Sequence, residues 1–142
     1  MASELRVNTL KDASGNNSVA TSFVAGGSAK AWLNLNGSAT FDVSDTEIND
    51  SFNVGSTVDN DSGDYSVTFT SAMADGNYAI AGTTKSNNAT TGTRGPNGIM
   101  TKNGVADTGN GFTILSARGS TASSDGALQD SIIYLAVHGD LL

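Results

Sequence analysis

The sequence predicts an all-β fold in which two antiparallel sheets pack face to face as a jelly-roll-like β-sandwich. Two observations lead to this prediction: apolar and polar residues alternate in many short segments, and turn-forming residues separate those segments. Alternation places every second side chain on one face of a strand, where a second sheet can bury it. The expected strands cover residues 29–35, 39–43, 51–58, 65–70, 77–82, 112–117 and 131–138.

The first of these segments predicts a hairpin. Ala31, Leu33 and Leu35 share one face, Asn36-Gly37 has the composition of a hairpin turn, and residues 39–43 continue the alternation. Trp32 lies on the opposite face. We expect its indole to pack against a covering sheet or another subunit, with stacking on a ligand as the less favoured alternative.

The clearest local pattern spans residues 51–70. Phe52 and Val54 alternate with polar residues before the turn-rich stretch Asp59–Asp64, and Tyr65–Phe69 alternates after it. This pattern predicts a second hairpin. The period resumes at Tyr78, so we expect a third strand beside the hairpin in the same half-buried sheet.

The last strand, residues 131–138, is apolar on both faces. Strands of this kind are buried on both sides, so we expect it in the centre of a sheet or in a subunit interface. The sequence divides into an N-terminal arm, residues 1–28, and a head domain, residues 29–142. The arm has too few large apolar residues to form a core, although residues 19–24 could form a short extended segment, and we expect it to order against a partner.

Composition limits the possible functions. The 142 residues fit one domain, and the net charge of −7 argues against nucleic acid and anionic membranes as partners. The chain has no cysteine, so we expect no disulfide and no thiolate metal site. The N-terminal residues do not resemble a signal peptide and no apolar run is long enough for membrane insertion, so we expect synthesis in a cytoplasm.

Two polar segments require separate interpretations. Between Asp42 and Asp64 every charged residue is acidic, and Asp59–Asp64 begins like a calcium-binding loop. Its glycine comes one position early and Thr70 occupies the position of the bidentate glutamate, so a turn between strands is the preferred interpretation. The segment Thr83–Gly111 is rich in glycine and carries Lys85, Arg94 and Lys102. It predicts a long loop whose positive charge could favour subunit contacts or an acidic sugar, or simply aid solubility.

The sequence contains no catalytic constellation. His138 is the sole histidine and is expected to pack at a strand end, no nucleophile-elbow motif is present, and the aspartates lie in turn-like segments. We therefore predict no catalytic, cofactor-binding or metal-binding residues, and a protein that is not an enzyme.

Several stretches resemble a group of virion proteins of tailed bacteriophages, especially marine phages. They are the opening Ala2–Asn17 (ASELRVNTLKDASGNN), Ala29–Gly37 (AKAWLNLNG), Asp50–Val54 (DSFNV), Gly63–Thr70 (GDYSVTFT) and Asn77-Tyr78. The resemblance covers about the first 80 residues of the chain. The loops 83–111 and 119–130 match no pattern of the group.

The resemblance implies a tail-fibre-like protein located in the virion. In that group the opening residues attach the protein to other virion proteins, and the β-rich remainder assembles as a homotrimer that often contacts the host surface, where polysaccharide is a possible ligand. The resemblance supplies no catalytic residues. Two alternatives stay open: a capsid decoration protein that stabilises the head, and a free carbohydrate-binding module.

Overall fold

The computed structural model of the chain describes residues 6–42, 46–86, 97–118 and 128–142. Within them the protein is built mainly of antiparallel strands, which confirms the all-β prediction. In chain order the elements are β1 (Thr9–Leu10), β2 (Val19–Ala20), α1 (Thr21–Gly27), β3 (Ala31–Asn36), β4 (Ile48–Phe52), β5 (Val54–Asp61), β6 (Asp64–Phe69), β7 (Ala79–Ser86), β8 (Asn97–Thr101), β9 (Gly111–Arg118) and β10 (Ser131–His138).

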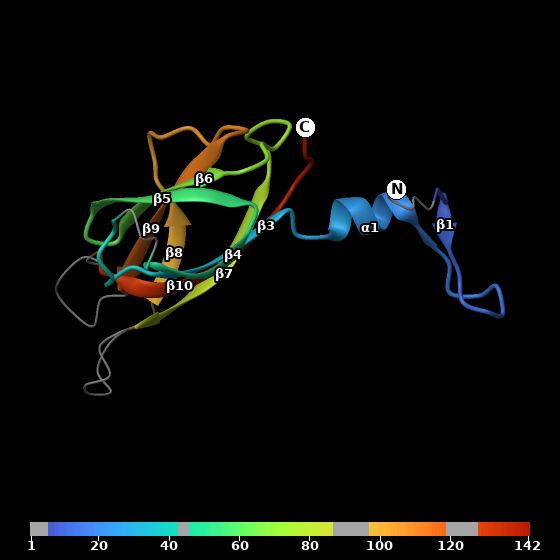
Figure 1. Cartoon of the computed structure of the whole chain (residues 1–142), viewed down its shortest axis with the longest axis horizontal. Coiled ribbons are helices and arrows are strands. Elements are labelled where there is room, and N and C mark those ends of the chain that lie inside the picture. Colours follow the sequence, from blue (N-terminus) through green and yellow to red (C-terminus); the bar gives the residue numbers. More distant parts are fainter. Residues whose placement is uncertain (1–5, 43–45, 87–96, 119–127) are drawn as a thin grey trace.

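Eight of these strands form two four-stranded antiparallel sheets (Figure 1). Sheet B has the order β4-β3-β10-β7, and sheet C has the order β5-β6-β9-β8. The chain passes directly from sheet B to sheet C at Asn53, which separates β4 from β5 and adopts a positive φ of 56°. This tight change of direction lets two consecutive strands belong to different sheets.

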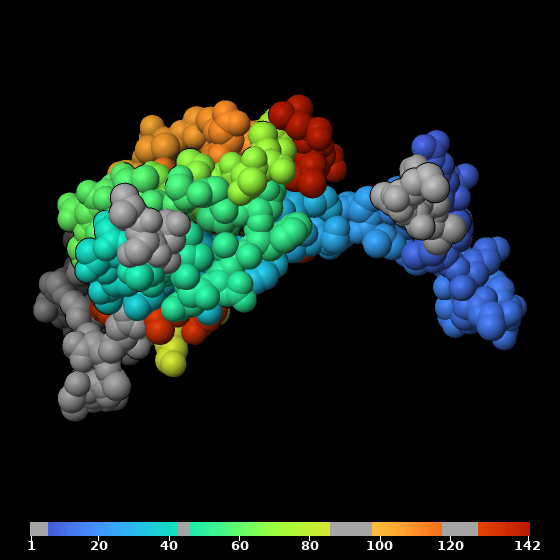
Figure 2. Space-filling model, viewed as in Figure 1, coloured from blue at the N-terminus to red at the C-terminus, as the bar shows by residue number. Residues whose placement is uncertain are grey.

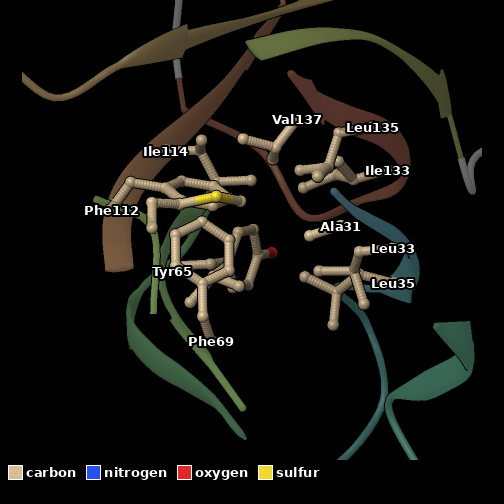
Figure 3. Packing of buried hydrophobic residues seen from close by; sticks show 12 residues of the cluster. Ala31, Leu33, Leu35, Tyr65, Phe69, Phe112, Ile114, Ile133, Leu135 and Val137 are labelled. Atoms are coloured by element: carbon tan, nitrogen blue, oxygen red, sulfur yellow. The ribbon is translucent and has the colours of Figure 1, made fainter. Parts of the chain in front are cut away.

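Both sheets contribute to one hydrophobic core. Alternate residues of β3 and β10 point toward alternate residues of β6 and β9 (Figure 3). The buried members are Ala31, Leu33, Leu35, Tyr65, Val67, Phe69, Met73, Phe112, Ile114, Ile133, Leu135 and Val137. Burial of this apolar surface is the dominant stabilising contribution, because each large side chain removed from water contributes roughly 1.5–3 kcal/mol.

The structure corrects the first of the two predicted hairpins and the sheet expected for the strand after the second. Residues 39–42 form no strand, and Val43 lies outside the described residues. Instead β3 pairs with β4, and Phe41 stacks on Tyr65 with a ring-centroid distance of 5.6 Å. The β5–β6 hairpin is confirmed, but the strand after it, β7, joins sheet B beside β10 rather than extending the hairpin.

The C-terminal strand is central, as its apolar pattern predicts. β10 pairs with β3 on one side and with β7 on the other. Only one of its faces is fully covered: Ile133, Leu135 and Val137 are buried, whereas Tyr134 remains 38% exposed. The other face of β10 is therefore an outer surface of the single chain.

The described N-terminal residues project from the two sheets (Figures 1 and 2). β1 and β2 form a two-stranded hairpin, so the extended segment expected at residues 19–24 is present only at Val19–Ala20, and α1 begins at Thr21. Between residues 6 and 28 no side chain is buried. Among the described helical residues none forms a segment long and apolar enough to cross a membrane.

Candidate interaction surface

The outer surface of sheet B carries a band of apolar side chains, which we call the aromatic face. Strand register places Trp32 opposite both Phe52 on β4 and Ala136 on β10, and Ala136 lies opposite Ala81 on β7. Ile132 and Tyr134 extend the band along β10. The aromatic face is thus composed of Phe52, Trp32, Ala136, Ala81, Tyr134 and Ile132, and it crosses all four strands.

The large side chains of the aromatic face are only partly covered by the chain itself. Trp32 is 37% exposed, Tyr134 38% and Phe52 54%. An exposed cluster of aromatic residues on an otherwise polar protein is typical of a protein interface, where tyrosine and tryptophan are enriched. The prediction that Trp32 opposes the buried Ala/Leu face is confirmed, because Leu33 and Leu35 are each at most 1% exposed.

The outer surface of sheet C has a different character. Hydroxyl groups bond across its strands: Ser56 Oγ lies 2.7 Å from Thr68 Oγ1, and Ser66 Oγ lies 3.2 Å from Thr113 Oγ1. Val58 and Met100 are exposed here, but they lie on the opposite edge strands β5 and β8. Sheet C therefore presents a more polar outer surface, and sheet B presents the better candidate for contact with protein.

A small hollow lies beside the aromatic face, where the arm joins the sheets; we call it the neck pocket. Its volume is about 300 Å³, and its lining residues are Lys30, Phe52, Asn53, Thr70, Ser71 and Leu141. Asn53 fixes the wall: its Nδ2 donates to the carbonyl oxygens of Lys30 and Ser71 at 3.1 and 3.0 Å, and its Oδ1 accepts the Ser71 N–H at 2.6 Å.

The strand ends define two opposite ends of the molecule. In sheet B, Ala31 and Ala79 lie at the end where the arm attaches, and Asn36 and Ser86 lie at the other, which we call the distal end. The Ser116 N–H donates a hydrogen bond to Gly63 O at 2.7 Å, and the Gln129 N–H donates to Ser116 O at 2.9 Å. These bonds place the neighbouring parts of sheet C at the distal end too. The residues that border segments 87–96 and 119–127 all lie there.

The predicted loop Thr83–Gly111 is only partly a loop. It contains the second half of β7 and all of β8, which sequence inspection missed. Ile99 packs against the core from β8, so a short segment surrounded by glycine can still complete a sheet. Asn97 on β8 pairs with Arg118 on β9 at the distal end. The residues between β8 and β9 lie near the arm, because the Met73 N–H donates to Gly109 O at 2.8 Å and Met73 itself pairs with Leu141 of the neck pocket. Arg94 lies outside the described residues.

The turn between β5 and β6 is shorter than the predicted Asp59–Asp64, because β5 continues to Asp61 and β6 begins at Asp64. Asp64 is buried and forms an ion pair with Lys102, while burial and the nearby carboxylates of Asp130 and Asp61 raise the pKa of Asp59. Within the described ranges no three His, Asp or Glu side chains are arranged to hold a metal ion. This end of the hairpin is a hydrogen-bonded turn with one compensating cation.

His138 occupies the last position of β10 opposite Ala79, at the outer face of sheet B, and it is partly buried. Comparisons of the chain with protein-family models, curated proteins and solved structures find no match. Neither the neck pocket nor α1 has a sequence signal, because the pocket joins residues from distant segments and α1 lacks a helix-capping side chain.

Proposed function

We propose that this protein is a structural component of a tailed-phage virion, a projecting homotrimeric fibre or spike that contacts the host surface. The observation that carries the proposal is the polarity of the chain. The described residues of the arm include no buried side chain and leave one end of the head, and the residues that border segments 87–96 and 119–127 lie at the opposite end. An attachment segment and a recognition end are thereby separated along one molecule.

The head supports this proposal through its architecture. Eight strands in two sheets, with the first head strand β3 paired to the last strand β10, fit a jelly-roll-like β-sandwich, an architecture found in viral capsid proteins. The resemblance to phage fibre proteins falls on the arm and on β3, β4 and β6. The same residues provide the arm's hairpin, Trp32 and Phe52.

The aromatic face supports the trimer. Trp32, Phe52 and Tyr134 would each lose their remaining exposure at a subunit contact, and the chain has no disulfide to stabilise a monomer. Three copies arranged around one axis would bury equivalent faces against one another or against adjacent surfaces. Sedimentation of a stable folded monomer at micromolar concentration would contradict this assembly.

The function we propose is binding rather than catalysis. Recognition loops are commonly positioned by a rigid scaffold, and the distal end offers two such attachment sites. A host polysaccharide is the ligand class we favour, because weak binding at each copy is amplified by ~10²- to 10⁴-fold when many copies engage together.

Deletion of residues 2–17 tests the attachment role. We expect the truncated protein to fold and to associate as before, since no side chain from residue 6 onward in this segment is buried, yet to be absent from purified particles. Quantitative mass spectrometry of intact particles measures its copy number. Full incorporation of the truncated protein would show that the proposed polarity is wrong.

Replacement of residues 87–96, between β7 and β8, tests the recognition role. We expect particles with normal composition and altered host adsorption. Unchanged adsorption together with a copy number comparable to that of the capsid protein would favour the decoration function. Detection of the protein only outside particles would favour a free carbohydrate-binding module.

A further inference from the structure

Among the residues that the structure describes, helix α1 has no partner in its own chain that buries any of its side chains. None of its residues is buried, Phe23 is 76% exposed and Val24 is 47% exposed. Helices shorter than about 12 residues are marginal on their own, and each glycine lowers helix stability by about 1 kcal/mol relative to alanine. α1 has seven residues and ends in Gly26-Gly27. Its stability therefore requires packing against another surface.

The neck pocket is the complementary surface. Two of its walls are apolar side chains that the chain leaves uncovered, Phe52 at 54% and Leu141 at 45% exposure. The hydrogen bonds of Asn53 hold the third wall in place. A single apolar side chain inserted between Phe52 and Leu141 would remove all three hydrophobic groups from water.

Phe23 cannot reach the neck pocket of its own chain in this arrangement. Lys30 Nζ bonds to the carbonyl oxygens of Ala25 and Ser28 at the C-terminal end of α1, and the Lys30 N–H donates to Val137 O at 2.8 Å. Ser28 between them has an extended backbone, with φ −79° and ψ 143°. The link is short and held at both ends, so α1 is directed away from the sheets, as Figure 1 shows.

A second copy of the chain is the occupant that the positions favour. Phe52 belongs both to the neck pocket and to the aromatic face, where it lies opposite Trp32. α1 ends at Gly27, five residues before Trp32. A neighbour whose own Trp32 lies in the subunit contact therefore brings its helix close to the edge at which this pocket opens.

We propose that the subunits exchange their helices, with Phe23 of each copy inserted into the neck pocket of the next copy around the threefold axis. This inference rests on the proposed homotrimer and assigns separate roles within the arm: the β1–β2 hairpin for the particle and α1 for the neighbouring subunit. A head-to-tail contact of this kind closes into a ring when the rotation between copies is constant.

Engineered cysteines provide the test, because the natural chain contains none. Two differently tagged chains are co-expressed, one with Phe23→Cys and the other with Leu141→Cys, and the complex is oxidised. We expect a disulfide-linked heterodimer on a non-reducing gel. Val58→Cys replaces Leu141→Cys in the matched control, since Val58 is 50% exposed but lies on sheet C, and we expect no link there.

The possible outcomes separate this inference from the proposed trimer. A chain carrying both Phe23→Cys and Leu141→Cys that closes only on itself would overturn helix exchange. Absence of the mixed link in a preparation that sediments as a trimer would also overturn it and leave the trimer intact. A wild-type chain that sediments as a monomer would reject both.

A cysteine-free measurement supplements the cross-link. Phe23→Ala should weaken subunit association by at least ~10-fold, the effect expected from removing one buried phenylalanine. Val19→Ala on β2, where Val19 is 38% exposed, serves as the control and should leave association unchanged. Equal association of wild type and Phe23→Ala by sedimentation equilibrium would contradict the proposal.

Discussion

The hydroxyl group of Tyr65 donates a 2.7 Å hydrogen bond to Oδ1 of Asp130, and the N–H of Gly63 donates to the same oxygen at 2.7 Å. Tyr65 is fully buried on β6 in sheet C, whereas Asp130 directly precedes β10 in sheet B. One carboxylate oxygen thus joins the two sheets at the distal end, and the ring of the same Tyr65 stacks on Phe41.

Tyr65→Phe should lower the free energy of unfolding by about 1–2 kcal/mol, because the change removes a buried donor to a charged acceptor while retaining the ring. Urea denaturation at fixed protein concentration measures the effect. Tyr134→Phe, at a partly exposed position, is the control and should change stability by less than about 0.5 kcal/mol. Equal effects of the two substitutions would show that the Asp130 bond is not stabilising.

Stability should also fall at alkaline pH. Burial and the Asp107 carboxylate raise the pKa of Tyr78 to about 12, and burial with the Asp130 hydrogen bond raises the pKa of Tyr65 further. Unfolded tyrosine loses its proton near pH 10, so above that pH the native state binds more protons than the unfolded state and stability decreases with pH.

The measurement is the urea midpoint between pH 9 and pH 12, a range that includes the ordinary tyrosine pKa near 10 and extends to the pKa of native Tyr78 at about 12. Stability is fully present below pH 10, and Tyr65→Phe should reduce the slope above it by up to about 1.4 kcal/mol per pH unit. Tyr134→Phe serves again as the control. A slope that Tyr65→Phe leaves unchanged would contradict the assignment.

Two glycines with positive φ provide a matched comparison. Gly63 has φ +68°, and a Cβ there would lie 2.5 Å from Ser116 O and 2.6 Å from Gln129 N; Gly104 has φ +80° with nothing within 4 Å. Gly104→Ala should cost about 1–2 kcal/mol from backbone strain alone. Gly63→Ala should cost clearly more, roughly 3 kcal/mol or above, because backbone atoms must shift as well. Similar melting temperatures for both variants would contradict the close approach at Gly63.

The ion pair between Lys102 and Asp64 should be stabilising. The Asp64 side chain is 7% exposed and that of Lys102 36%, and Asn60 Nδ2 also donates to Asp64 at 3.2 Å. Lys102→Met should lower the free energy of unfolding by ~1–3 kcal/mol, since it leaves a buried carboxylate without its cation. The double variant with Asp64→Asn should recover part of that loss in a double-mutant cycle. Strict additivity of the two substitutions would show that the pair contributes nothing.

Trp32→Gln should weaken subunit association while the single chain stays folded, because the indole lies on the outer surface of sheet B. Hot-spot aromatic residues contribute roughly 2 kcal/mol or more to an interface, which corresponds to a ~30-fold change. Val58→Gln on sheet C is the control. Sedimentation velocity with far-UV spectra measures both properties, and a trimer unaffected by Trp32→Gln would place the subunit contact elsewhere.

Alternation along the chain was sufficient to predict most strands and their buried faces. Leu33, Tyr65 and Ile133 lie inside because the period of two marks one face of each strand, and the doubly apolar β10 is central as expected. Pairing was harder to predict. β3 and β10 are far apart in sequence, and nothing local to Asn36-Gly37 shows that β3 pairs with β4 across residues 37–47.

The candidate surfaces were likewise predicted only in part from the sequence. Trp32 could be predicted as outward-facing from its strand alone. Its neighbours Phe52, Ala136 and Ala81 come from three other strands. The aromatic face therefore depends on the pairing and register of four strands, which no local sequence pattern predicts. α1 was missed because a seven-residue segment with two glycines has weak intrinsic helix preference.

The central place of β10 in sheet B has a consequence for the time at which the protein folds. During translation β3, β4 and β7 leave the ribosome before β10, so the strand that joins β3 to β7 is the last of the described strands to be made. Until then β3 and β7 are not joined in sheet B, and the aromatic face lacks the residues that β10 contributes. In the proposed trimer, subunits on the same polysome could therefore associate through the aromatic face only after β10 has been made, and a chain that ends before β10 would lack the complete face.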